Sequence, residues 1–409
     1  MLHPNPKGPA IRAVMLASYC LLVCLGAPTA RAQDHEHAQG PPKNVPGSSM
    51  PFVKLDDAGR LHMVFVEDTG ENKLVRYRRM FGVEHIESVI SSPGDRLSHF
   101  PDSPPVVEVT SDGAVHALYT VRVPGPPNVW PVELRYVTSR DEGRTWSPYK
   151  ALGDPGAAVF RGCAAMLEDA RGRLVMSWLE GHPGQGEIGV NTAVVKNDTF
   201  TYAFIDDMAC ECCATELLRA SDGAIWLAYR NKDAFNVRDM YAARMARGDD
   251  RFGPPNRISR DGWVVNGCPE NGPRLARGGA HTVWAAWFTG GEPRGIYAGR
   301  ASSATPLFET RELVQGRDEH VSAIGHVAIS ALPDGRVLIA YNCQRDGQGR
   351  IEGRFRQENG WGDPIQLGGN GIFPRIATNG HAAYLVYTAI DGEQKSIVVE
   401  KLDSELPRS

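Results

Sequence analysis

The sequence predicts an all-β fold, a β-propeller of four-stranded antiparallel blades. One pattern recurs seven times along the chain: a short apolar stretch, a turn that contains glycine, and an alternating apolar strand rich in aromatic residues. Successive turn glycines lie about 45 to 60 residues apart, and a repeat of this length made of strands and turns is typical of propellers. The repeats cover residues 52–68, 105–122, 164–180, 215–231, 273–289, 327–343 and 374–390.

The turns and the spaces between the repeats support the same fold. Each repeat is followed by enough chain for two more strands, such as 132–139 and 147–152 after the second repeat. Seven repeats predict seven blades, with six as the alternative, and a two-sheet sandwich fits the regular spacing less well. The last repeat has room for only about three strands, so residues before Phe52 are expected to supply its fourth. Three turns are Asp-Gly pairs, which two-residue hairpins favour, at Asp112-Gly113, Asp222-Gly223 and Asp334-Gly335.

Composition and the N-terminus bound the class of protein. The chain has 409 residues, 42% hydrophobic and 22% charged, with a formal net charge of −4, so we expect a globular protein and no nucleic-acid partner. Residues 1–32 are expected to be a secretory signal, because basic residues precede an apolar run that ends in Ala30-Arg31-Ala32. Residues 33–50 are expected to form a flexible lead-in, and 51–403 the propeller domain. We expect export to the periplasm or beyond, with no integral membrane segment after signal removal.

One motif carries a family resemblance. Residues 139–146 read Ser-Arg-Asp-Glu-Gly-Arg-Thr-Trp, which resembles the Asp-box, or BNR repeat, of the sialidase-like (neuraminidase-like) β-propeller superfamily. The resemblance implies a hairpin turn on the outer part of a blade, remote from the active site. Ser139 and Asp141 are then expected to tie the turn's backbone and Trp146 to pack between strands, with Gly143 and Thr145 completing the motif.

The resemblance implies a catalytic constellation that this sequence only partly matches. Sialidases are expected to hold a carboxylate with three arginines and to use a Tyr–Glu nucleophile and an Asp acid/base. The family's Arg-Ile-Pro motif is Ser49-Met50-Pro51 here, and its Glu-Gly-Arg is Glu67-Asp68-Thr69, so both substrate clamps are absent. The remaining candidate site residues are Arg230, Arg274, Arg345, Arg375, Glu211, Glu216 and Glu270. They could form a pocket for an anionic ligand or for acid/base chemistry. Alternatively, the arginines could pair with carboxylates of the inner strands.

The cysteines are the strongest signal of a site. Six of the eight lie beyond the expected signal, and each falls in a loop before an inner strand or at the end of a second strand. Both positions open on one face of a propeller, around the mouth of the central channel. We therefore expect a cysteine-lined site there, joined by His326 and formed by Cys163, Cys210, Cys212, Cys213, Cys268 and Cys343.

Two main interpretations of these thiols remain open. An exported protein with six cysteines can hold disulfides, although adjacent Cys212 and Cys213 lie too close to bond each other. Alternatively, Cys-x-Cys-Cys at 210–213 places three soft donors in one turn, which favours Cu or Zn. That three-cysteine spacing is not a standard zinc pattern, and Cys268 or a histidine is expected to complete the coordination. A redox-active thiol pair is the third interpretation.

These observations predict an exported propeller that binds a metal, small molecule, glycan or protein on its top face, rather than an active sialidase. The alternatives are a diverged exo-sialidase or related glycoside hydrolase, and an interaction scaffold whose loops are held by disulfides.

Overall fold

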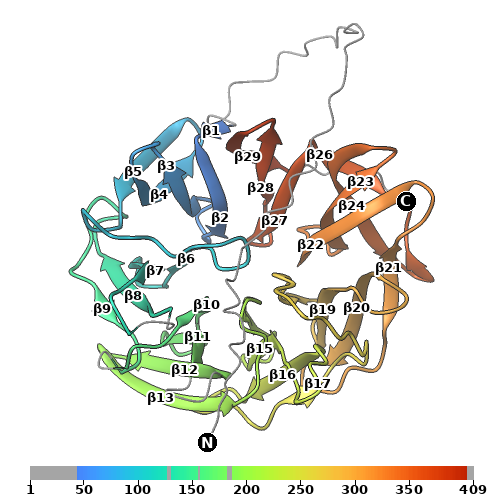
Figure 1. Ribbon diagram of the computed structural model, residues 1–409, viewed down its shortest axis with the longest axis horizontal. Helices are drawn as coiled ribbons and strands as arrows, with labels where there is room; N and C mark the ends of the chain where they lie inside the picture. The colour runs from blue at the N-terminus through green and yellow to red at the C-terminus, as the bar shows by residue number, and fades with distance from the viewer. Residues whose placement is uncertain (1–43, 127–129, 155–156, 182–186, 403–409) are drawn as a thin grey trace, which may run out of the picture. The chain divides into compact units, whose positions relative to one another are not determined.

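Seven antiparallel blades surround a central channel in the computed structural model (Figure 1). The structure describes residues 44–126, 130–154, 157–181 and 187–402, all of which belong to one compact unit. The expected signal at 1–32 and the lead-in as far as residue 43 lie outside these residues. Within them the fold is all-β, and no helix is long and apolar enough to cross a membrane.

Each blade follows the chain order from an inner strand to an outer one. The first blade contains β2 (Ser48–Leu55), β3 (Leu61–Asp68), β4 (Lys73–Phe81) and β5 (Glu84–Val89). The second contains β6 (Val106–Val109), β7 (Val115–Arg122), β8 (Val132–Ser139) and β9 (Lys150–Ala151). The third contains β10 (Arg161–Glu168), β11 (Leu174–Gly181), β12 (Ile188–Lys196) and β13 (Thr199–Asp206).

The next three blades repeat this arrangement, except that two short segments share the outer edge of the sixth. The fourth blade contains β14 (Glu216–Arg219), β15 (Ile225–Arg230), β16 (Met240–Met245) and β17 (Asn256–Arg257). The fifth contains β18 (Arg274–Arg277), β19 (Thr282–Thr289), β20 (Gly295–Ser302) and β21 (Glu312–Gly316). The sixth contains β22 (Val321–Ala331), β23 (Val337–Arg345) and β24 (Gln348–Gln357), with β25 (Gly360–Trp361) and β26 (Ile365–Gly368) at its outer edge.

The seventh blade joins the two ends of the domain. β27 (Gly371–Thr378), β28 (Ala383–Asp391) and β29 (Gln394–Lys401) come from the C-terminal end, and β1 (Asn44–Pro46) pairs with β29 as the fourth strand. Figure 1 shows β1 beside β29, next to the first blade. The prediction that residues before Phe52 complete the last blade is therefore confirmed. Residues 44–50, expected in the flexible lead-in, instead form β1 and the start of β2, because β29 offers a free edge for pairing.

The blades pack through apolar strands that are covered on both faces. All six residues of β15 are buried, as are the first seven of β7, because neighbouring blades lie against both sides of each sheet. The predicted Asp-Gly turns lie between first and second strands, where Gly113, Gly223 and Gly335 adopt φ values of +83°, +81° and +85°.

The Asp-box forms a closed turn between β8 and β9, as the resemblance implied. Asp141 accepts hydrogen bonds from the backbone N–H and the hydroxyl of Thr145 at 2.9 and 2.6 Å, and Ser139 accepts one from Gly143 N at 2.8 Å. Trp146 donates from Nε1 to Ser88 of the first blade at 2.9 Å and so links the two outer edges. The motif stabilises the blade and lies away from the channel.

Candidate functional site

The inner strands begin at the end of the channel to which the cysteines were assigned. Four of them, β2, β10, β22 and β27, carry a β-bulge near their start. In three of these bulges one residue adopts a positive φ: Met50 at 56°, Cys163 at 55° and Phe373 at 55°. This conformation is costly for residues other than glycine, so the surrounding contacts must hold it in place. The bulges bend the backbone at the channel mouth and interrupt the regular ladder, which resumes before them.

The loop before β14 holds three cysteines in a tight turn. Cys213 N donates to Cys210 O at 3.3 Å, and Cys210 N donates to Arg230 O at 2.8 Å. On the far side of the turn, Ala214 N donates to Asp102 and Thr215 N donates to Cys163 O at 3.0 Å. The turn is thus fixed to the second, third and fourth blades before any ligand binds.

This turn gathers the three sulfurs into one buried group. Cys210 Sγ lies 3.1 Å from Cys213 Sγ and 4.0 Å from Cys212 Sγ, and all three ligand atoms lie within 4.8 Å of one another. The three residues are 0%, 5% and 1% exposed, with Phe100 packed against them. Metal–sulfur bonds of about 2.3 Å would hold sulfurs roughly 3.8 Å apart. The separation of Cys210 and Cys212 is close to this value, and that of Cys210 and Cys213 is shorter.

Two buried arginines set the electrostatics of the cysteine group. Arg238 donates from Nη1 to Cys210 Sγ at 2.9 Å and to Glu211 at 3.1 Å. Burial alone raises the pKa of the Cys210 thiol, but hydrogen bonds from Cys212 and Cys213 and the charges of Arg230 and Arg238 outweigh burial and lower it. Cys210 is therefore the sulfur best prepared to be a thiolate.

The other predicted thiols occupy different surroundings, and all six cysteines are unpaired. Cys163 is buried beside the group, where burial and the nearby Asp102 and Cys213 raise its pKa, but its sulfur is not among the three that lie together. Cys268 is exposed in the loop before β18. Cys343 packs in the apolar core around β22 and β23. The structure thus brings together only three of the six predicted cysteines.

His326 lies elsewhere at the channel mouth. Its ring packs 3.9 Å from that of Phe373, and burial lowers its pKa to about 4. Its Nδ1 has no hydrogen-bond partner among the described residues. It is not part of the sulfur group.

Asp102 is the anchor of this face. Its carboxylate is 1% exposed and accepts hydrogen bonds from Ala214 N at 2.8 Å, Gly272 N at 2.5 Å and Arg274 Nη2 at 2.7 Å. Burial raises the pKa of Asp102, but the charge of Arg274, other nearby charges and the hydrogen bond from Ala214 N together outweigh burial and hold the pKa below its usual value. One side chain of the second blade thus fixes the loops of the fourth and fifth.

Some of the candidate arginines form ion pairs or hydrogen bonds within the fold, and one forms neither with its side chain in the described residues. Arg345 pairs with Glu352 at 2.5 Å, and Arg274 pairs with Asp102 and lies 3.8 Å from Glu216, as one of the two sequence interpretations expected. Arg230 binds backbone carbonyl groups, as described below. Arg375 lies over the Phe52 ring at 5.2 Å, and no hydrogen bond or ion pair to it is found in the described residues.

The candidate carboxylates Glu216 and Glu270 lie near the channel mouth. Burial raises the pKa of both, against the nearby charge of Arg274 for Glu216 and together with the charge of Asp102 for Glu270. Glu211 is partly exposed and pairs with Arg238 and Lys232. Glu216 and Glu270 are therefore harder to ionise than an exposed glutamate.

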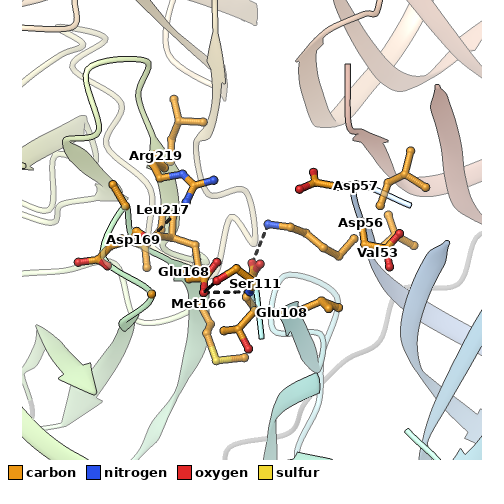
Figure 2. Close-up of a pocket in the computed structure, with 18 of the residues that line it drawn as sticks. Val53, Asp56, Asp57, Glu108, Ser111, Met166, Glu168, Asp169, Leu217 and Arg219 are labelled. Atoms are coloured by element: carbon orange, nitrogen blue, oxygen red, sulfur yellow. Dashed lines mark hydrogen bonds and ion pairs between the residues drawn. The ribbon is translucent and has the colours of Figure 1, made fainter. Parts of the chain in front are cut away.

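A larger hollow lies at the other end of the inner strands. It encloses about 680 Å³ between the first four blades and reaches their hairpin turns. Figure 2 shows Asp56 and Asp57 across it from Glu168 and Asp169, with Glu108 and Ser111 between them. Several of its charged groups have partners: Lys54 pairs with Glu108 at 2.7 Å, and Ser111 donates to Glu168 at 2.7 Å. It is separate from the cysteine group.

Sequence reasoning missed three features of the site. Cys210 and Cys213 alone have the Cys-x-x-Cys spacing that zinc and dithiol sites share; counting three cysteines together obscured it. Asp102 stands in a Pro- and Ser-rich connection that resembles an ordinary turn. Arg238 follows the second strand of its blade by several residues, and only the folded loop brings it to Cys210.

The comparisons with known proteins concern the fold. No protein-family model matches the chain, and no curated protein matches it. Among solved structures, the polysaccharide lyase Uly1 superposes with a TM-score of 0.51 at 10% identity, covering 86% of this chain and 89% of that one. A Trypanosoma rangeli sialidase in complex with sialic acid superposes with a TM-score of 0.50 at 13% identity, covering 88% of this chain and 55% of that one.

These similarities and the Asp-box define the class of fold. The chain has a seven-bladed β-propeller fold, and this fold is similar to that of the Trypanosoma rangeli sialidase. At such low identity the likeness extends to the fold alone. The chemistry must be argued from this chain's own residues.

Proposed function

We propose that the protein is an exported binding protein for a soft metal ion, held by Cys210, Cys212 and Cys213. The observation that carries this proposal is the group of three buried sulfurs within 4.8 Å of one another, none bonded to another. Thiolates are soft ligands that favour Cu(I) and Zn. The turn that carries them is fixed by hydrogen bonds to three blades, so little ordering is needed on binding.

Elemental analysis of the full chain, purified from the export compartment without chelators, tests this proposal. We expect about one Cu or Zn per chain. Each of Cys210→Ala, Cys212→Ala and Cys213→Ala is expected to lose the metal, while the matched Cys343→Ala is expected to keep it. Cys343 is also buried but lies outside the group, so this control separates ligation from general damage to the core.

Thiol counting on the same sample distinguishes metal binding from the redox and scaffold interpretations. If thiol counting on protein that is folded and metal-free finds Cys210 and Cys213 bridged, the redox or scaffold interpretation replaces metal binding. Retention of metal by all three cluster variants would also exclude these sulfurs as the ligands.

A specific observation favours a second candidate, a diverged glycoside hydrolase. Glu216 and Glu270 have pKa values raised by burial, and the nearby Arg375 has no ion pair in the described residues. Glycosidases use two carboxyl groups, one of them with a raised pKa, at the scissile bond. Release of dye from a fluorogenic sialoside or arabinoside, abolished in Glu216→Gln, tests this function; no turnover by folded protein on either substrate excludes it for those sugars.

A further inference from the structure

A fully buried cation without an acidic partner stands beside the cysteine group. Arg230 is 0% exposed, and its guanidinium donates only to carbonyl oxygens: Asn271 O at 2.8 and 3.1 Å, Arg238 O at 2.9 Å and Phe288 O at 2.7 Å. Its Cζ also lies 4.9 Å from the ring centre of Trp263. No carboxylate in the described part of the chain forms an ion pair with it. An uncompensated buried charge is costly, so a negative charge is needed nearby.

The second arginine faces the sulfurs directly. Arg238, whose side chain is 3% exposed, donates to Cys210 Sγ at 2.9 Å and to Asn236 at 3.3 Å, and its acidic partner Glu211 is also paired with Lys232 at 3.4 Å. The charges of Glu211 and Lys232 cancel at the edge of the site. Two buried positive charges, those of Arg230 and Arg238, are then left for the sulfur group to balance.

Charge balance distinguishes between the two metals. Three thiolates with Cu(I) carry a net charge of about −2, which the two arginines neutralise, whereas three thiolates with Zn²⁺ carry about −1 and leave an excess positive charge. The number of ligands points the same way. No fourth His, Cys, Asp or Glu atom of the described residues belongs to the group, while structural zinc almost always takes four ligands.

We propose that the site binds Cu(I) through three thiolates, and that Arg230 and Arg238 select this monovalent ion by compensating the charge of the thiolates. The inference rests on the proposed metal-binding function and names the ion. Arg238 acts through Cys210 as a positioning residue, since it holds the sulfur that faces it. Arg230 is fixed by its carbonyl partners and supplies charge without contacting the metal.

An anaerobic titration of the reduced, metal-free full chain tests the choice of ion. Cu(I) and Zn²⁺ are added separately in competition with chromogenic chelators of known affinity, and X-ray absorption gives the ligands of the bound ion. We expect one Cu(I) per chain with three sulfur neighbours, bound at least about a hundredfold more tightly than Zn²⁺. Tighter binding of Zn²⁺ with four ligands overturns the inference and leaves metal binding intact. Binding of neither ion overturns the metal-binding function itself.

Variants of Arg238 test the role of its charge. In Arg238→Gln, which keeps a donor but loses the charge, we expect Cu(I) affinity to fall about 10- to 100-fold and the preference over Zn²⁺ to shrink. Arg238→Lys keeps the charge and is expected to retain the preference. Arg76→Gln, which removes an arginine paired with Glu67 in the first blade, is the matched control and is expected to change neither affinity. An equal fall in both affinities in Arg238→Gln, or loss of the preference in Arg238→Lys, overturns selection by charge.

Discussion

Single residues at the channel mouth obtain their chemistry from neighbours that lie far away in sequence. Cys210 and Cys343 are both buried cysteines of one chain, yet Cys210 faces a guanidinium and Cys343 faces an apolar core and Glu352. Burial and that carboxylate raise the pKa of Cys343 to about 12, whereas the pKa of Cys210 is lowered. Residue type therefore indicates candidate ligands, and the surroundings in the folded protein determine which of these cysteines can ionise and bind a metal.

The replacement Asp102→Asn tests the anchor of this face. The carboxylate accepts three hydrogen bonds, including one from buried Arg274, so an amide leaves that cation with only the more distant Glu216 as a charged partner. We expect the free energy of unfolding to fall by roughly 3 kcal/mol, measured by urea denaturation. Asp391→Asn in the exposed β28–β29 turn is the control. A loss below about 0.5 kcal/mol, typical of surface substitutions, would contradict the anchoring role.

At the scale of elements, one side-chain contact is repeated in neighbouring blades. His62 and His116 open the second strands of the first two blades, and each Nδ1 lies 2.7 Å from a tyrosine hydroxyl on the adjacent third strand, Tyr77 and Tyr136 respectively. Burial lowers the pKa of both histidines to about 4. Burial therefore makes protonation of these imidazoles in the folded state costly.

These histidines predict a loss of stability on acidification. Between about pH 6.5 and pH 4 the unfolded histidine binds a proton that the folded one does not, so the free energy of unfolding falls as pH falls through this window. From pH 7 to pH 5 we expect His116 to account for roughly 2 kcal/mol of the decrease. His116→Gln should flatten the pH profile of urea unfolding by that amount, and the exposed His381→Gln should not. An unchanged profile in His116→Gln would show that folding does not shift the pKa of His116.

The elements were easier to predict than the site because they depend on local patterns. Alternating apolar residues and Asp-Gly turns are sufficient to specify a strand pair, and the Asp-box turn is specified within eight residues. The sulfur group depends instead on where one loop ends relative to Asp102 and Arg238, which belong to another blade and another loop. The sequence therefore indicated the face but included Cys268 and Cys343, whose side chains point into solvent and core.

On the scale of the whole molecule, ring closure depends on one short strand. Val45 of β1 is 6% exposed and packs in the core shared by the first and last blades. β1 covers the edge of β29, which would otherwise be open to pairing with another chain.

A pair of shortened chains tests this closure. A chain that starts at Ser48 lacks β1, so we expect a lower unfolding temperature and association through β29, seen by light scattering. A chain that starts at Asn44 keeps β1 and is the control, expected to remain as stable as the full chain. Equal unfolding temperatures for the two chains would show that β1 contributes little to closure.

Pairing of β1 with β29 also sets the order of events in folding. The first described strand of the domain finds its partner only when the last strand has been made, so the ring stays open throughout synthesis and, if the chain is exported, throughout its passage. The cysteine turn is in the fourth blade, whose strands are neighbours in the chain and can pair earlier. We therefore expect ring closure to follow formation of the cysteine turn and to involve only the two ends of the domain.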